Sequence, residues 1–153
     1  MQLDGAGFAE LCNTHGQNFV DPFEIPGDLD VRGGSGTVTW TEGCNLRVAP
    51  GARLRFDHVS LTGCSLNFNM FGGEGSKLDI DHSRISMGNQ TYFLFDAVAG
   101  QDVRVSHSTL DQCGENDFTN VIVTASFGTG GHVTVEHSTL RAAESGSGED
   151  FGR

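Results

Sequence analysis

Apolar and polar residues alternate in four short segments of the chain, and the four segments have nearly the same sequence. They are RLRFDHVSL at 53–61, KLDIDHSRI at 77–85, DVRVSHSTL at 102–110 and HVTVEHSTL at 132–140. Strict alternation is the pattern of a β-strand that buries one of its two faces. Each alternating run ends at a histidine and is followed by a second, shorter apolar stretch. Each segment therefore predicts a strand, a turn and another strand.

A third strand-like run lies before each of these segments. The four runs are NLRVAP at 45–50, SLNFNM at 65–70, TYFLFDA at 91–97 and NVIVTA at 120–125. Glycine-rich connections separate the runs, and nothing within a repeat has the period of a helix. The repeat thus consists of three short strands and recurs every 24–30 residues, which is typical of a solenoid.

Three short strands in a repeat of this length predict an all-β protein, a parallel β-helix in which each repeat forms one coil. Propeller blades need about 40 residues per repeat, and leucine-rich repeats have their own asparagine and leucine signature, so both fit less well. The β-helix is expected over residues 35–142. Residues 1–34 are expected to form an N-terminal capping segment and a partial coil, with a helical turn in GFAELC. Residues 143–153 are expected to be a flexible polar tail.

The repeated pattern apolar-x-apolar-x-His-Ser-x-apolar resembles the repeat of right-handed parallel β-helices of the pectate-lyase-like kind, over roughly residues 36–142. In that family an asparagine commonly occupies the position of the histidine, in a tight turn between two strands, and stacks with its counterparts as an internal ladder. The resemblance implies a right-handed, single-stranded coil of about four to five turns. It specifies architecture rather than activity, because the same coil carries lyases, hydrolases, adhesins and phage spikes.

Residues one repeat apart should be vertical neighbours in such a coil. The inward columns then are Leu54–Leu78–Val103–Val133 and Phe56–Ile80–Val105–Val135, and the outward columns are Arg55–Asp79–Arg104 and Arg53–Lys77–Asp102. A further column contains His58, His82, His107 and His137. These histidines share the inward parity of their strands, so we expect a buried structural ladder, with a shared zinc or copper ion as the alternative. Burial would disfavour the imidazolium form, so stability should fall as the pH drops through about 6.

Composition and charge narrow the classes of partner. The net charge of −11 makes a nucleic-acid phosphate backbone an unsuitable partner, and no apolar run is long enough for a membrane span. The sequon NQT at Asn89 favours an extracellular or cell-surface protein, although no signal peptide is visible and the compartment stays open. Cys44 and Cys64 are expected on adjacent coils as buried free thiols, and Cys12 and Cys113 have no evident partner.

In the family that the repeat resembles, catalytic residues lie on the outer face of the sheet formed here by the third strand-like runs. Acids there bind calcium or act as acid and base, and an arginine or lysine abstracts a proton. The outward residues expected on this face include one carboxylate, Asp96, and one arginine, Arg47, which are the candidates for catalysis. The acid pair of a hydrolase and the acid cluster of a calcium-dependent lyase are both missing from it. No cofactor is expected, and calcium between Asp57 and Asp81 is the alternative.

The remaining outward residues of that face are amides and a tyrosine, which suit sugar hydroxyls and a pyranose ring. They are Asn45, Asn67, Asn69, Tyr92 and Asn120. The sequence therefore predicts a non-catalytic structural or adhesive module of an extracellular, cell-surface or viral assembly, with surface carbohydrate as its ligand. One alternative is a polysaccharide lyase or glycoside hydrolase. The other is a fibre subunit that stacks end to end, because the glycine-rich C-terminal segment is a poor cover for the last coil.

Overall fold

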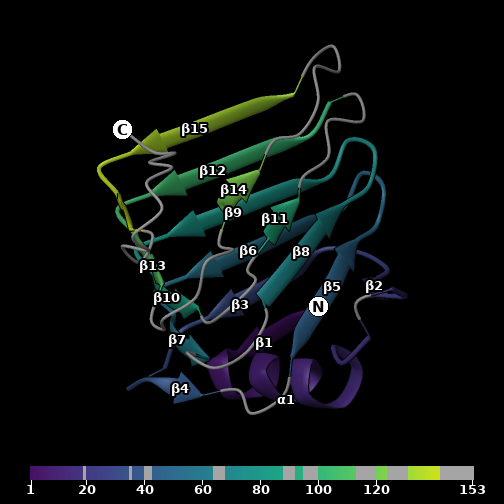
Figure 1. Ribbon diagram of the computed structural model, residues 1–153, viewed down its shortest axis with the longest axis horizontal. Coiled ribbons are helices and arrows are strands. Elements are labelled where there is room, and N and C mark those ends of the chain that lie inside the picture. The colour runs from purple at the N-terminus through teal and green to yellow at the C-terminus, as the bar shows by residue number, and fades with distance from the viewer. Residues whose placement is uncertain are drawn as a thin grey trace.

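The computed structural model describes most of the 153-residue chain, in nine ranges. These are residues 1–18, 20–34, 36–39, 43–63, 68–87, 92–94, 100–112, 120–123 and 131–141. Within them the chain is a parallel β-solenoid. Strands of successive coils lie side by side in three parallel sheets, as Figure 1 shows. The all-β solenoid predicted from the repeat is confirmed.

The three sheets each take one strand from successive coils. The first sheet has the order β1 (Gln2–Asp4), β3 (Leu29–Arg32), β6 (Arg53–Asp57), β9 (Lys77–Asp81), β12 (Asp102–Ser106) and β15 (His132–Glu136). The second sheet has the order β4 (Val38–Thr39), β7 (Ser60–Gly63), β10 (Arg84–Met87), β13 (Thr109–Gln112) and β16 (Thr139–Arg141). The third sheet has the order β2 (Phe23–Ile25), β5 (Cys44–Val48), β8 (Phe68–Gly72), β11 (Tyr92–Leu94) and β14 (Asn120–Val123).

The register of the first sheet follows the repeat. Leu54 pairs with Leu78 and Leu78 with Val103, and these three side chains are at most 3% exposed. The second inward column, which starts at Phe56, and both predicted outward columns are in register as well. Burial of each of these apolar side chains stabilises the fold by about 1.5–3 kcal/mol. The interior of the solenoid is therefore a set of stacked apolar columns.

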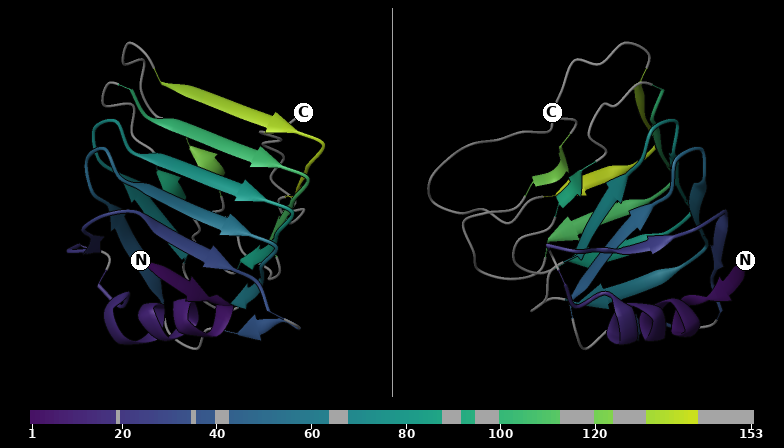
Figure 2. Two further views of the ribbon diagram at one scale, coloured as in Figure 1. Left: turned by 180° about the vertical axis from the view of Figure 1, so that it is seen from behind. Right: turned by 90° about the vertical axis from the view of Figure 1, so that its right-hand side faces the viewer.

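Helix α1 (Gly5–His15) covers the N-terminal end of the solenoid, and β15 lies at the opposite end (Figures 1 and 2). The N-cap of α1 is Asp4, whose side chain accepts a hydrogen bond from the Gly7 amide. Phe8 is fully buried and meets the ring of Phe56 edge-on at 5.0 Å. The helix is longer than the predicted turn because it has a side-chain cap and buries one apolar face against the first coil.

The cysteine prediction is wrong for Cys44. Cys44 forms a disulfide with Cys12 of α1, and its neighbour on the next coil is Phe68 rather than Cys64. The observed register of these two strands differs by four residues from the one expected. A two-residue alternation repeats along a strand, so it does not fix which residues of neighbouring coils face each other. Cys64 and Cys113 lie outside the described residues.

None of the helices in the described ranges is long and apolar enough to cross a lipid bilayer. The predicted tail at 143–153 lies outside the described residues.

Candidate functional site

The corner between the first and second sheets is built by the repeated histidines. His58, His82, His107 and His137 have φ angles of 55°, 45°, 48° and 49°, in the left-handed region. The backbone amides of the first three donate to the next coil, for example His58 to the carbonyl of Asp81 at 3.1 Å and His82 to that of Ser106 at 3.1 Å. A left-handed conformation is unfavourable for a residue with a side chain. Here the hydrogen bonds of the neighbouring coil hold it in place.

This turn reverses the side-chain alternation, and the prediction that the histidines are buried is therefore wrong. Phe56 faces the core, Asp57 and His58 both face outward, and Val59 faces the core again. The side chains of His58, His82 and His107 are 69%, 47% and 49% exposed. A left-handed residue adds one outward position at the corner, much as a bulge does in a sheet. The expected loss of stability near pH 6 depended on buried histidines and loses its basis.

Serine, one residue after the histidine, forms the buried polar ladder. The Ser83 hydroxyl accepts from the amide of Val59 at 3.1 Å and donates to the carbonyl of Asp81 at 2.8 Å. Ser108 repeats the arrangement with the amide of Ser83 and the carbonyl of Ser106. Apolar alternation gives no sign of this ladder, although three of the four repeats contain the pair His-Ser, which is the signal that could have revealed it.

The histidine rings stack on the outer surface of the corner. Successive ring centroids are 4.7, 4.6 and 5.1 Å apart, with interplanar angles of 1°, 14° and 15°. The ring edges lie beside the last residues of β6, β9, β12 and β15, and three of these four residues are acids. The Nδ1 atom of His58 is 2.6 Å from Asp57 Oδ1. The corner therefore presents a column of imidazoles next to a column that contains carboxylates.

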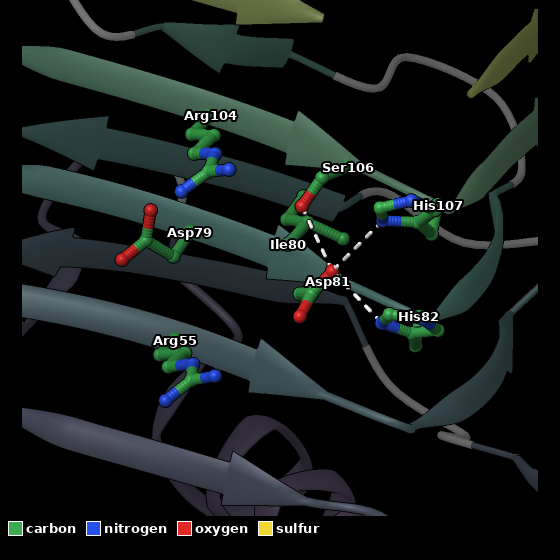
Figure 3. A pocket seen from close by; sticks show the side chains of 8 residues that line it. All are labelled: Arg55, Asp79, Ile80, Asp81, His82, Arg104, Ser106 and His107. Carbon is green, nitrogen blue, oxygen red and sulfur yellow. Dashed lines mark hydrogen bonds and ion pairs between the residues drawn. The ribbon is translucent and has the colours of Figure 1, made fainter. Parts of the chain in front are cut away.

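Asp81 is the most connected acid of the corner. Its Oδ1 atom accepts a hydrogen bond from Ser106 Oγ at 2.8 Å, and it lies 3.0 Å from His82 Nδ1 and 3.6 Å from His107 Nδ1 (Figure 3). The hydrogen bond from Ser106, with smaller contributions from His82 and His107, holds the pKa of the Asp81 carboxyl below its usual value, although desolvation acts in the opposite direction. Asp81 is therefore a carboxylate at neutral pH.

A shallow depression of about 270 Å³ extends from this corner across the outer face of β6, β9 and β12. Arg55 and Arg104 line it on either side of Asp79, in one outward column of the first sheet (Figure 3). Arg104 also donates to Glu136 at 2.6 Å, and this hydrogen bond raises the pKa of Arg104. The depression thus places donor-only guanidinium groups beside acceptor-only carboxylates.

The predicted amide face lies on the third sheet. Asn45, Asn69, Tyr92 and Asn120 occupy one column of its backbone register. The expectation that Asn45 faces a ligand is wrong, because its side chain is buried and its Nδ2 donates to the carbonyl of Gly16 at the end of α1. Asn67 lies outside the described residues, and so do the side chains of Asn69, Tyr92 and Asn120.

The described structure contains one of the two candidates for catalysis. Arg47 is exposed on β5, and Asp96 lies outside the described residues. Asp57 and Asp81, between which calcium was the alternative, are in register on β6 and β9, and each is close to a histidine nitrogen. Their neighbourhood therefore offers nitrogen as well as oxygen donors.

The stacked parallel coils place the chain in the class of β-solenoid proteins. In comparisons with known proteins, no family model, curated protein or solved structure matches this chain. The finer resemblance to pectate-lyase-like proteins stays a prediction.

Proposed function

We propose that the protein is a non-catalytic structural and adhesive module of an extracellular, cell-surface or viral assembly, and that it binds carbohydrate on the outer face of its first sheet. The disulfide between Cys12 and Cys44 supports such a location, because disulfides persist mainly in oxidising compartments. The rigid solenoid is the scaffold, and the depression over β6, β9 and β12 is the binding face.

The observation that carries this proposal is the alternation of Arg55, Asp79 and Arg104 in that depression. A guanidinium group only donates hydrogen bonds and a carboxylate only accepts them, whereas a hydroxyl does both. A ligand rich in hydroxyl groups can therefore satisfy every member of this row. Because the coils repeat every ~4.8 Å, the row suits an extended polymer with a short repeat. A saccharide chain has both properties.

Glycan-array binding of the full chain, followed by calorimetry with any oligosaccharide that binds, tests the proposal. The paired change of Arg55→Ala and Arg104→Ala should remove binding. Arg47→Ala is the matched control, since this exposed arginine lies on the third sheet. Loss of binding only in Asn67→Ala with Asn69→Ala would move the site to the amide face. Binding to no saccharide, or release of sugar from a polysaccharide panel, would overturn the proposal.

A second candidate function, end-to-end assembly, is favoured by β15, which is the last strand of the first sheet within the described residues. Val133 and Val135 are 45% and 43% exposed, whereas Val103 and Val105, their partners on the preceding coil, are buried. An edge strand with exposed apolar side chains offers both hydrogen-bonding groups and apolar surface to another strand. A second copy of the chain could pair with β15 in this way.

Sedimentation velocity over a range of concentrations tests this second candidate. Self-association should increase with concentration and disappear in Val133→Lys with Val135→Lys. Thr134→Lys is the control, because Thr134 pairs with Arg104 in the outward column and leaves the apolar surface unchanged. A protein that stays monomeric at every concentration would rule this assembly out.

A further inference from the structure

We propose that Asp81, His82 and His107 bind one divalent transition-metal ion of the class that includes zinc, copper and nickel. This inference is independent of the carbohydrate proposal. It concerns the corner at one end of the depression and uses a different chemistry.

The first argument is the convergence of three ligand atoms. One carboxylate oxygen of Asp81 and one ring nitrogen each of His82 and His107 all lie within 4.8 Å of one another. The oxygen is 3.0 Å from one nitrogen and 3.6 Å from the other. Ligands about 2.0–2.1 Å from a tetrahedral zinc ion are about 3.3 Å apart, which lies between these two distances. Small rotations of the exposed rings would complete the geometry.

The second argument is that the backbone positions both rings in advance. His82 and His107 occupy the same left-handed turn on adjacent coils, and their amides donate to the carbonyls of Ser106 and Glu136. Their rings are stacked 4.6 Å apart at an angle of 14°. Metal sites need their ligands held close to the bound geometry by the rest of the fold. The repeat supplies this, since each coil fixes the turn of the coil beside it.

The third argument is the support of the carboxylate. Ser106 Oγ donates to the same oxygen of Asp81 that faces both rings. Ser106 occupies the place in the column where Asp57, Asp81 and Glu136 stand on the other coils. A hydrogen bond of this kind orients a metal ligand and tunes its affinity. Ser106 is therefore a positioning residue of the proposed site.

The donor set selects the class of metal. Two imidazoles and one carboxylate suit zinc, copper or nickel, whereas calcium takes six to eight oxygen ligands. Three protein ligands also leave a fourth position open to water, as the partial exposure of all three side chains allows. The sequence offered calcium between Asp57 and Asp81 as an alternative, and these donors disfavour calcium at this corner in comparison with zinc.

The other acid–histidine pairs provide internal controls. Asp57 Oδ1 is close to His58, but within the described part of the chain only Asp81, His82 and His107 form a cluster of three or more such ligands. His58→Asn and His137→Asn are matched to His82→Asn and His107→Asn, because all four positions have the same left-handed backbone. Asparagine tolerates this conformation better than most residues, so the turn is preserved.

The test is calorimetric titration of tag-free, chelator-treated protein with zinc chloride. We expect one zinc ion per chain, and an affinity that falls by about tenfold or more in His82→Asn, His107→Asn and Asp81→Asn. Ser106→Ala should weaken binding by about 10–100-fold while leaving one ion per chain. His58→Asn and His137→Asn should bind zinc as the unaltered protein does. Equal melting temperatures without zinc would show that the variants fold alike.

A second measurement needs no variant. In an NMR titration of the unaltered protein, zinc should shift the ring signals of His82 and His107 and leave those of His15 and His132 unchanged. Failure to bind zinc at ~1 mM, or an equal loss of affinity in the His58 and His137 variants, would overturn the proposal. Several zinc ions per chain, bound along the whole histidine column, would overturn it as well.

Discussion

His82 and His107, one repeat apart in the sequence, stack with their ring centroids 4.6 Å apart and turn their Nδ1 atoms toward one carboxylate oxygen of Asp81. Both residues adopt a left-handed backbone conformation at the corner between the first and second sheets, and both rings lie on the surface rather than in the core. The same residue therefore has a backbone role and a separate side-chain role. This separation makes the corner open to experiment, because the side chain can be changed while the turn is kept.

The left-handed turn predicts how substitutions at His82 rank in stability. His82→Val should lower the free energy of unfolding by about 1–2 kcal/mol more than His82→Asn, because a β-branched residue is poorly accommodated at a φ of 45°. Urea denaturation measures both variants. Arg104→Val is the control, because it places the same β-branched residue at an exposed position of the extended strand β12. It should lower the free energy of unfolding by less than His82→Val does. Equal stability of His82→Val and His82→Asn would contradict the turn.

The buried serine ladder predicts a specific cost for Ser108→Ala. This change leaves the amide of Ser83 without its hydrogen-bond acceptor in the core. An unsatisfied buried donor costs about 1–3 kcal/mol, so the urea midpoint should fall accordingly. Thr134→Ala on the exposed face of β15 is the control and should change stability little. A urea midpoint for Ser108→Ala equal to that of the control would show that the serine ladder does not stabilise the fold.

The disulfide between α1 and β5 predicts sensitivity to reduction. Its two cysteines are separated by 32 residues, and a cross-link of this kind stabilises a fold by about 2–4 kcal/mol. Cys12→Ser with Cys44→Ser should lower the melting temperature. A reductant should lower that of the unaltered protein to the same level and have no further effect on the double variant. A melting temperature of the unaltered protein that does not respond to reductant would show that the bond is absent.

Asp81 predicts how stability depends on pH in metal-free protein. Because hydrogen bonding from Ser106 lowers the pKa of Asp81 in the folded state, the carboxylate stabilises the fold above its unfolded pKa of about 3.9. That contribution should be lost as the pH falls through the lower, folded value. Asp81→Asn should therefore reduce the difference in unfolding free energy between pH 7 and pH 3. Asp79→Asn is the matched acid on the same strand. An unchanged pH dependence in Asp81→Asn would contradict this linkage.

The first sheet is the part of the fold whose strand register the sequence predicts correctly. Its inward columns were predicted correctly from Leu54 to Val103, because a near-identical alternating run recurs in every repeat and leaves only one register that buries the apolar side chains. The third sheet lacks such a repeated run. Its pairing of Cys44 with Phe68 has the same 24-residue offset as the pairing of Arg53 with Lys77 in the first sheet, so the offset of the repeat predicts this register where apolar alternation alone does not.

The sequence by itself determined that this chain winds into stacked parallel coils, since only that arrangement buries apolar positions that recur once per repeat. The tertiary structure alone decided the surroundings of Cys12, Asn45 and the histidines. Helix α1 folds back over the first coil, which joins Cys12 to Cys44 and buries Asn45 against Gly16. Because of the left-handed turn, each histidine faces outward and the residue after it faces inward. Alternation along a strand cannot reveal either effect, because one depends on a distant segment and the other on a single backbone angle.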